Sequence, residues 1–235
     1  MSLQVDAVLF DLDETLIDSL RGQRAAHVEV AKRLMLILES QNVQMTFEDL
    51  LRCVSDFDDE MDVRLIRDRN KWWPTLFRML GGKDLSKKEA RELTRAYWIA
   101  YARNSPPYED AIPTLEYLRS KRYKIGLVTD TDGTPGMKRR RISLTGLEKY
   151  LDTVVVGGED LKERKPNPEP FLLAAQRLGV PAERCVMVGD KAFVDARGAI
   201  AAGMKAILIH RREWDVPSVK PHYIIYCLSE LRSLL

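Results

Sequence analysis

The strongest constraint on the fold is a series of short apolar runs, each about the length of a β-strand. Several are rich in Val and Ile, and the later ones are separated by segments long enough to form a helix. The six runs are Ala7–Phe10, 125–128, 153–156, 185–188, 206–209 and Tyr223–Ile225. Strands that alternate with helices are typical of a parallel sheet, so the pattern predicts an α/β protein with a doubly wound, Rossmann-like core.

Three helices are predicted between the later strands. Apolar side chains recur at helical spacing over residues 111–122. A second helix is predicted over 170–178, with Asn167 as its N-cap and Pro168 as its first helical residue. A third, rich in small residues, is predicted over 192–202. These helices would cover the two faces of the sheet.

The chain between the first two strands has a different pattern. Helical patterns such as 25–39 and 88–102 follow one another, with no convincing strand between them. The Pro106-Pro107 pair suits a return hinge, because proline and the residue before it resist helix. We therefore expect a small all-helical domain inserted into the core. The expected bounds are 18–106 for the insert, and 1–17 with 107–235 for the core.

The overall charge narrows the set of partners. Its 37 basic and 35 acidic residues give the chain a net charge of +2, which produces no field strong enough to favour nucleic acid or an anionic membrane.

No apolar run approaches the ~18 residues that span a bilayer, and no secretory signal is visible. Cys53, Cys185 and Cys227 form no CxxC pair, so they indicate neither a disulfide framework nor a zinc site. We expect a cytoplasmic protein that is a monomer or a small homo-oligomer.

Two acidic residues lie at the end of the first strand. Asp11 ends it and Asp13 follows two positions later, and side chains at i and i+2 of an extended segment point the same way. Ligands bind at the carboxyl ends of strands in open α/β sheets, so the two carboxylates would share one site. On a structural interpretation, Asp13 and Thr15 would only be turn and helix-cap residues. This pattern alone leaves both interpretations open.

Polar residues also follow the later strands. Thr129 ends the second strand, and Lys165 stands just before a helix N-terminus, where its charge and the backbone dipole both favour an anion. The fourth strand runs into Gly189 and Asp190, and Asp195 follows five residues after Asp190. Carboxylates are hard oxygen ligands that suit Mg²⁺. Taken singly, the lysine could be solvated and either acid could cap a helix.

These elements occur in the order Asp-x-Asp-x-Thr, Thr, Lys-Pro and Gly-Asp-x₄-Asp, each at or near a strand end. Together they resemble the haloacid dehalogenase superfamily of phosphohydrolases. The resemblance covers residues 5–17 and 107–209, and its four motifs are jointly specific. The helical insert resembles that family's cap domain in its position and its helicity. The resemblance implies a hydrolase that acts on phosphomonoesters.

The resemblance assigns roles to the acids of the first strand. Asp11 matches the nucleophile, which attacks phosphorus and becomes an aspartyl phosphate. Asp13 matches the general acid and base, which protonates the leaving oxygen and later activates water. We therefore expect the pKa of Asp13 to lie above that of Asp11. Dehalogenase members have no acid at this position, so Asp13 indicates action on phosphate.

The resemblance also implies a Mg²⁺ cofactor. The carboxylates of Asp11 and Asp190 and the backbone carbonyl of Asp13 would bind the ion, and Asp195 would orient these ligands. The bound ion would offset the repulsion between an anionic nucleophile and an anionic phosphate.

Phosphoryl oxygens would be bound by Thr129 and Lys165, with Asp130 as a further substrate contact. Asp130 stands where an Asn is common in the family, and Lys191 stands where a small hydroxyl residue is frequent. Neither departure touches a principal catalytic position, and Lys191 would add positive charge near the metal.

Two further features are interpreted as structural. The basic run 138–141 is expected to be a solvated helix face rather than a nucleic-acid site, because no aromatic residues interleave with it. The histidines show no ligand spacing and are expected to serve the structure; they are His27, His210 and His222.

The aromatic pair Trp72-Trp73 leaves two roles open. With Arg67, Arg69 and Lys71 nearby, these rings could close over a substrate as the insert shuts and excludes water. Packing within the insert is the favoured role, because large aromatic side chains mostly serve cores.

The function predicted from the sequence is a Mg²⁺-dependent phosphatase of a small phosphorylated metabolite. A sugar phosphomutase of the same superfamily would use the same two acids and return the phosphate to the sugar. An alternative of another class is a non-catalytic binding module that responds to phosphorylation, although such modules have no insert after the first strand. The sequence leaves the substrate open among sugar phosphates, phosphoglycolate, glyceraldehyde phosphate and nucleoside monophosphates.

Overall fold

The computed structural model describes residues 3–64, 66, 68–211 and 219–235, and it divides into two compact units. The first, the sheet unit, comprises Met1–Asp18, Pro106–Thr131 and Lys138–Leu235. The second, the helical unit, comprises Ser19–Ser105 and Asp132–Met137. The short segment Asp132–Met137 belongs to the helical unit, although its neighbours on both sides in the sequence belong to the sheet unit.

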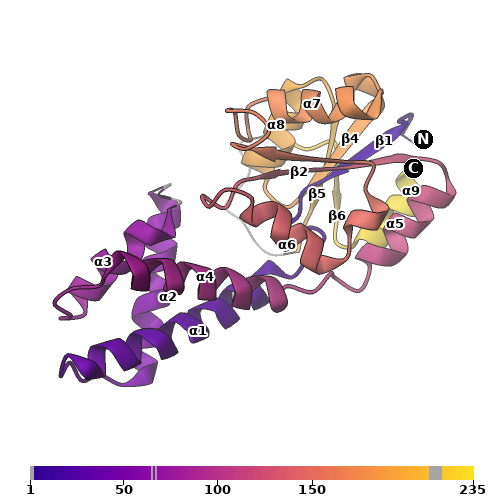
Figure 1. Ribbon diagram of the computed structural model, residues 1–235. Helices are drawn as coiled ribbons and strands as arrows, with labels where there is room; N and C mark the ends of the chain where they lie inside the picture. Colours follow the sequence, from indigo (N-terminus) through magenta and orange to yellow (C-terminus); the bar gives the residue numbers. More distant parts are fainter. Residues whose placement is uncertain (1–2, 65, 67, 212–218) are drawn as a thin grey trace. The chain divides into compact units, whose positions relative to one another are not determined.

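The described residues of the sheet unit form six strands in the order β3-β2-β1-β4-β5-β6, and every neighbouring pair is parallel (Figure 1). The strands are β1 Ala7–Phe10, β2 Lys124–Asp130, β3 Thr153–Gly157, β4 Cys185–Gly189, β5 Lys205–Ile209 and β6 Tyr223–Ile225. Each predicted run forms one of these strands. The order and the parallel pairing confirm the predicted doubly wound α/β fold.

Helices cover both faces of this sheet. Figure 1 shows α7 and α8 on one face and α5 and α9 on the other. The helices of the sheet unit are α5 Ala111–Ser120, α6 Met137–Thr145 apart from its first residue, α7 Glu169–Leu178, α8 Arg197–Ala201 and α9 Leu231–Leu234. Parallel strands need crossover connections. Here the helices between successive strands provide them and form the two outer layers.

Two helix predictions differ from the structure in detail. The N-cap of α7 is Pro168, one residue later than the predicted Asn167, and the helix begins at Glu169. The side chain of Asn167 accepts a hydrogen bond from the Glu169 N–H at 2.9 Å. The single helix predicted over 192–202 is a π-helical turn, Ala192–Ala196, followed by α8. Such turns are frequent at functional sites.

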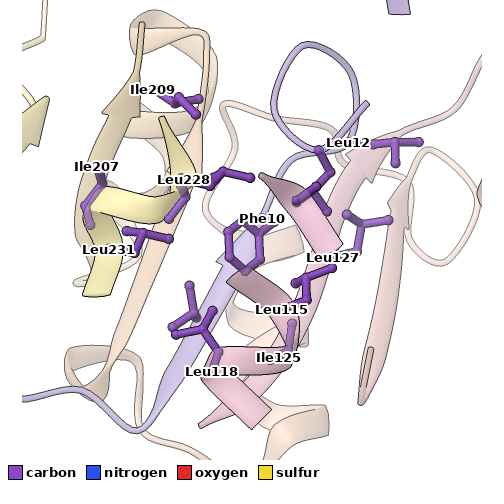
Figure 2. Close-up of a cluster of buried hydrophobic side chains, with 14 of the residues drawn as sticks. Phe10, Leu12, Leu115, Leu118, Ile125, Leu127, Ile207, Ile209, Leu228 and Leu231 are labelled. Atoms are coloured by element: carbon purple, nitrogen blue, oxygen red, sulfur yellow. The ribbon is translucent and has the colours of Figure 1, made fainter. Parts of the chain in front are cut away.

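Apolar side chains of β1 point alternately into two layers. Val8 and Phe10 pack with α5 and α9, whereas Leu9 packs with Phe171 of α7. Figure 2 shows Phe10 among side chains of β2, β5 and α5. Because Phe10 is fully buried, its burial contributes about 1.5–3 kcal/mol. Both faces of β1 are therefore fixed by packing, which determines where its carboxyl end lies.

Four helices form the described part of the helical unit. They are α1 Ser19–Ser40, α2 Phe47–Val63, α3 Arg69–Met79 and α4 Lys87–Arg103. Helix α4 begins with a capping box, in which Ser86 and Glu89 satisfy each other's backbone N–H groups. Side chains cap α2 and α3 at Thr46 and Asp68. Among the described residues, no helix is long and apolar enough to cross a membrane.

Packing is the role of the aromatic pair in α3. Trp72 and Trp73 are buried in the apolar core of the helical unit. Trp73 donates its ring N–H to the Thr94 hydroxyl at 2.9 Å. The favoured interpretation of these rings as core residues is confirmed. Of the neighbouring basic residues, Lys71 is exposed and Arg67 lies outside the described residues.

A polar group, which we call the Asp58 cluster, lies within this core. Asp58 Oδ2 lies 2.7 Å from His27 Nε2 and accepts a hydrogen bond from the Tyr97 hydroxyl at 2.7 Å. Arg69 donates to Asp58 Oδ1 at 2.9 Å. Burial favours the neutral acid, but Arg69, His27 and Tyr97 outweigh it and lower the pKa of Asp58 to about 2. The neighbours of Asp58 therefore stabilise its buried charge.

Candidate active site

The sheet brings Asp11 and Asp190 to one edge. Strands β1 and β4 are neighbours, with Phe10 opposite Val188, and the Asp11 N–H donates to the Val188 carbonyl at 2.9 Å. Asp11 follows the last residue of β1, and Asp190 follows Gly189, the last residue of β4. Both carboxylates therefore lie at the carboxyl end of the sheet, where ligands bind in this fold.

Three buried carboxylates meet at this edge. The side chains of Asp11, Asp190 and Asp195 each place one carboxylate oxygen within 4.8 Å of the others. They are only 7%, 1% and 2% exposed, respectively. Oxygen donors of this kind suit a hard divalent cation such as Mg²⁺, and buried like charges of this density require positive charge nearby. These residues therefore fit a divalent metal site, which we call the acidic cluster.

Lys165 supplies positive charge to the acidic cluster. Its Nζ donates to Asp11 Oδ1 at 2.6 Å and to Asp195 Oδ1 at 2.7 Å. The residue lies in the loop between β3 and α7, and its backbone N–H donates to Asp130 Oδ1 at 3.2 Å. A side chain at Gly157 would meet that oxygen at 2.3 Å. Glycine at the end of β3 therefore allows this loop to approach β2.

A second glycine makes room for Asp195. A Cβ atom at Gly189 would lie 2.4 Å from the Asp195 carboxyl group. The other oxygen of Asp195 accepts a hydrogen bond from the Lys191 N–H at 3.0 Å. The π-helical turn carries Asp195 directly over the end of β4. Asp195, predicted only to orient the metal ligands, thus lies as close to the cluster as the other two acids.

Burial and mutual repulsion shift the ionisation of this cluster. Burial, with the charges of Asp11 and Asp195, raises the pKa of Asp190 to about 8. Burial also raises the pKa of Asp11, although Lys165 acts against it. For Lys165, burial alone would lower the pKa, but Asp11 and Asp195 outweigh it and raise the pKa well above its usual range. A bound cation would therefore stabilise the ionised form of these carboxylates.

Asp13 lies in a different electrostatic environment. Lys138 Nζ donates to its Oδ2 at 2.7 Å, and the Arg141 guanidinium donates to its Oδ1. Burial alone would raise the pKa of Asp13, but Arg141 and Lys138 outweigh it and lower the pKa well below its usual value. The prediction that the pKa of Asp13 exceeds that of Asp11 is therefore wrong. The reason is that two cations adjoin Asp13, whereas Asp11 adjoins other acids.

The basic run 138–141 also differs from its predicted role. Arg139 and Arg140 are exposed, as a solvated face requires, but Lys138 and Arg141 are buried. These two are three residues apart, so they share one face of α6. The interpretation of the whole run as a solvated face is wrong for this pair. Their i,i+3 spacing is the signal that could have separated them from their neighbours.

Thr129 and Asp130 end β2 on opposite faces of the sheet. Neighbouring side chains alternate along a strand, and Val128 and Asp130 share the face that bears α7. Asp130 contacts the Lys165 backbone on that face, and burial raises its pKa. Thr129 is buried and points to the other face. Of the predicted residues, the structure thus groups Asp11, Asp190, Asp195 and Lys165 most closely.

Comparison with known proteins agrees with this arrangement. A family model described as haloacid dehalogenase-like hydrolase matches residues 5–203. The chain is 32% identical to N-acylneuraminate-9-phosphatase from Rattus norvegicus, with 99% of this chain and 94% of that protein covered. It is 31% identical to glyceraldehyde 3-phosphate phosphatase from Methanopyrus kandleri, with 90% and 86% covered.

A solved structure supports the same relationship. The crystal structure of a HAD phosphatase from Thermococcus onnurineus superposes with a TM-score of 0.68 at 33% identity, and the match covers 97% of this chain and 96% of that one. The resemblance seen in the four sequence motifs is thereby confirmed, and it makes this protein an enzyme rather than a passive binding module. The chain belongs to the haloacid dehalogenase-like hydrolase family.

Proposed function

We propose that this protein is a Mg²⁺-dependent phosphatase, which hydrolyses a small-molecule phosphomonoester through an aspartyl phosphate on Asp11. The observation that carries the proposal is the convergence of three buried carboxylates with the Lys165 ammonium group at the carboxyl end of the sheet. The relatives described above support it, because their names are those of phosphatases. The phosphorylated compound that this chain accepts would be a small metabolite.

In this proposal each acid of the first strand has its own step. Asp11 would attack phosphorus and form the covalent intermediate, which divides one difficult displacement into two easier ones. Asp13 would give a proton to the leaving oxygen and later take one from the attacking water. The cations beside Asp13 keep it ionised, which suits the second step. The arriving phosphate dianion would raise the proton affinity of Asp13 for the first step.

The remaining residues would neutralise and orient charge. The carboxylates of Asp11 and Asp190 and the backbone carbonyl of Asp13 would hold Mg²⁺, and Asp195 would orient this set. When bound, the ion offsets repulsion between nucleophile and phosphate. Lys165 and Thr129 would bind phosphoryl oxygens, where charge must be stabilised, and Asp130 at the end of β2 would be a further substrate contact.

The domain division is part of the same proposal. Residues 18–106 would form the family's cap domain, and residues 1–17 with 107–235 would form the catalytic core. The helicity of Ser19–Ser105 supports this division. The unpaired pattern of the three cysteines supports a reducing, cytoplasmic location.

The direct test is hydrolysis of p-nitrophenyl phosphate by the purified protein. We expect turnover with Mg²⁺, loss of turnover in EDTA, and loss of turnover in Asp11→Asn and Asp190→Asn. Asp6→Asn is the matched control, because Asp6 is exposed and pairs with Arg184 away from the acidic cluster. Equal activity of Asp11→Asn and the unchanged protein would refute the proposed nucleophile.

A second measurement separates hydrolysis from phosphoryl return. With a hexose 1-phosphate as substrate, a phosphatase releases inorganic phosphate, whereas a phosphomutase forms the isomeric hexose phosphate. We expect free phosphate to account for the substrate consumed. Accumulation of the isomer instead would assign the chain to the mutase alternative.

A further inference from the structure

Two buried cations lie behind the Asp13 carboxylate. The side chains of Lys138 and Arg141 are only 5% and 2% exposed, whereas that of Asp13 is 29% exposed. The carboxylate is thus the outward member of the group, and the two cations face it from the protein interior. Neither cation has the exposure that direct contact with a substrate would require.

The geometry holds both oxygens of one carboxylate. Lys138 Nζ lies 2.7 Å from Oδ2, and the Arg141 guanidinium contacts Oδ1. Hydrogen bonds between charged groups are short and strong, and two of them on separate oxygens restrict rotation of the carboxyl group. Helix α6 presents both cations from one face, so their separation is set by the helix. The Asp13 side chain therefore has one fixed orientation.

Burying two cations in this way has a free-energy cost that calls for an explanation. Removing a cation from water costs several kcal/mol, and apolar side chains at the same positions of a helix often give equal or greater stability. Arg139 and Arg140, on the solvated part of the same helix, show that basic residues here need no such burial. An orientation that catalysis requires would account for the pair.

We infer that Lys138 and Arg141 are positioning residues, which fix the orientation of the Asp13 carboxylate for proton transfer to and from the reacting oxygen. The inference rests on the proposed phosphatase function. A general acid must lie within hydrogen-bond reach of the leaving oxygen, and small displacements of a catalytic group are costly in rate. Lys138 and Arg141 would act on the reaction through Asp13, so their effect should depend on how much a substrate needs the proton that Asp13 donates.

That dependence gives a test with two substrates. The phenolate that leaves p-nitrophenyl phosphate needs no proton, whereas the alkoxide that leaves glycerol phosphate does. For Lys138→Met and Arg141→Met, we expect kcat with glycerol phosphate to fall by about 10²-fold, within the range for general acid catalysis, and kcat with p-nitrophenyl phosphate to change little. Arg140→Met, on the exposed part of α6, should behave as the unchanged protein on both substrates.

Three outcomes would overturn the inference. Equal losses on the two substrates would indicate a merely structural pair, unchanged kcat on both would indicate no role, and a rise in KM alone would indicate direct contact with the substrate. Arg141→Lys keeps a cation and should recover part of the activity on glycerol phosphate. This variant also serves as the test if the methionine variants do not fold, since it should then show the same substrate-dependent loss in milder form.

Failure of this inference is distinct from failure of the proposed function. If the unchanged protein hydrolyses neither substrate with Mg²⁺, the phosphatase proposal itself is refuted. If it hydrolyses both and the variants lose both equally, the phosphatase proposal survives and only the positioning role is refuted.

Discussion

The acidic cluster and the Asp58 cluster are both buried and ionisable, but they differ in balance. In the sheet unit, three carboxylates share Lys165. In the helical unit, the single carboxylate of Asp58 has Arg69, His27 and Tyr97 around it. Burial raises the pKa of Asp190 to about 8, whereas the partners of Asp58 overcome burial and lower its pKa to about 2.

This difference in charge balance distinguishes a functional site from a structural cluster. Removal of a buried charge that its neighbours compensate leaves those neighbours uncompensated and destabilises the fold. A buried excess of one sign strongly shifts the pKa values of its members, and perturbed groups of this kind gather at functional sites. The acidic cluster has that excess, so its acids should respond to mutation, metal and pH in the opposite way to Asp58.

The largest effect is expected for removal of one charge from the acidic cluster. Asp11→Asn should lower kcat/KM by at least about 10³-fold, as loss of a nucleophile does. In EDTA the same variant should have a free energy of unfolding equal to or above that of the unchanged protein, because it relieves repulsion among buried carboxylates. Phosphate release and urea unfolding measure the two quantities. A marked loss of stability in EDTA would show that the cluster is balanced after all.

The reverse result is expected in the helical unit. Asp58→Ala should lower the free energy of unfolding by about 3–5 kcal/mol, because Arg69 stays buried without its carboxylate. Tryptophan fluorescence during urea unfolding reports mainly on this unit, which contains three of the four tryptophans of the chain, Trp72, Trp73 and Trp98. The exposed Asp56 offers a control, since Asp56→Ala should change stability by less than about 0.5 kcal/mol. Similar losses in the free energy of unfolding for both variants would show that Asp58 contributes no more to stability than an exposed acid.

The next largest effect is expected from Mg²⁺, which should bind the acidic cluster and not the Asp58 cluster. Mg²⁺ at 100 times its dissociation constant should stabilise the protein by about 2.7 kcal/mol, because it binds only the folded acidic cluster. Thermal unfolding with and without the ion measures this difference. Asp190→Asn should abolish the stabilisation and Asp56→Ala should keep it. Stabilisation that survives in Asp190→Asn would place the ion elsewhere.

The smallest effect expected is a pair of opposite pH dependences in EDTA. The pKa of Asp190 is raised, so the folded protein binds more protons than the unfolded chain between about pH 4 and 8, and stability should fall as pH rises through that window, by at most about 1.4 kcal/mol per unit. The pKa of Asp58 is lowered to about 2, so its contribution is present above about pH 4 and is lost as pH falls toward 2.

Unfolding titrations of two variants separate these contributions. Asp190→Asn should flatten the slope between pH 4 and 8 and leave the acid limb unchanged. Asp58→Asn should flatten the acid limb alone. A variant that altered both limbs would show that the two groups titrate together.

The fold was predictable because its signal is local. Buried parallel strands are short apolar runs, and β1 and β4 were recognisable from residues 7–10 and 185–188 alone. The helical unit was predicted with less detail, since α2 and α3 emerge only from packing around residues such as Trp72. The π-helical turn that carries Asp195 has no signature in spacing, because a helix of either kind has nearly the same pattern.

The site was predictable only where topology supplies the contacts. Parallel strands carry their carboxyl ends to one edge, which is why Asp11 and Asp190 could be paired from the sequence. Lys138 lies 125 residues from Asp13, and although its spacing from Arg141 places both on one helix face, nothing in the local sequence says that this face is the buried one. Long-range ion pairs of this kind arise only in the packed structure. The reversed pKa order of Asp11 and Asp13 also results from this packing.

The distance along the chain between Asp11 and Lys165, 154 residues, bears on how the protein is made. Domains fold during synthesis as their residues leave the ribosome, and contacts between distant segments form last. A nascent chain would therefore carry its first-strand acids through most of translation with no partner for them, and would stay inert until β4 emerged. Truncation ahead of that strand should yield a polypeptide that retains the helices of the insert and hydrolyses nothing.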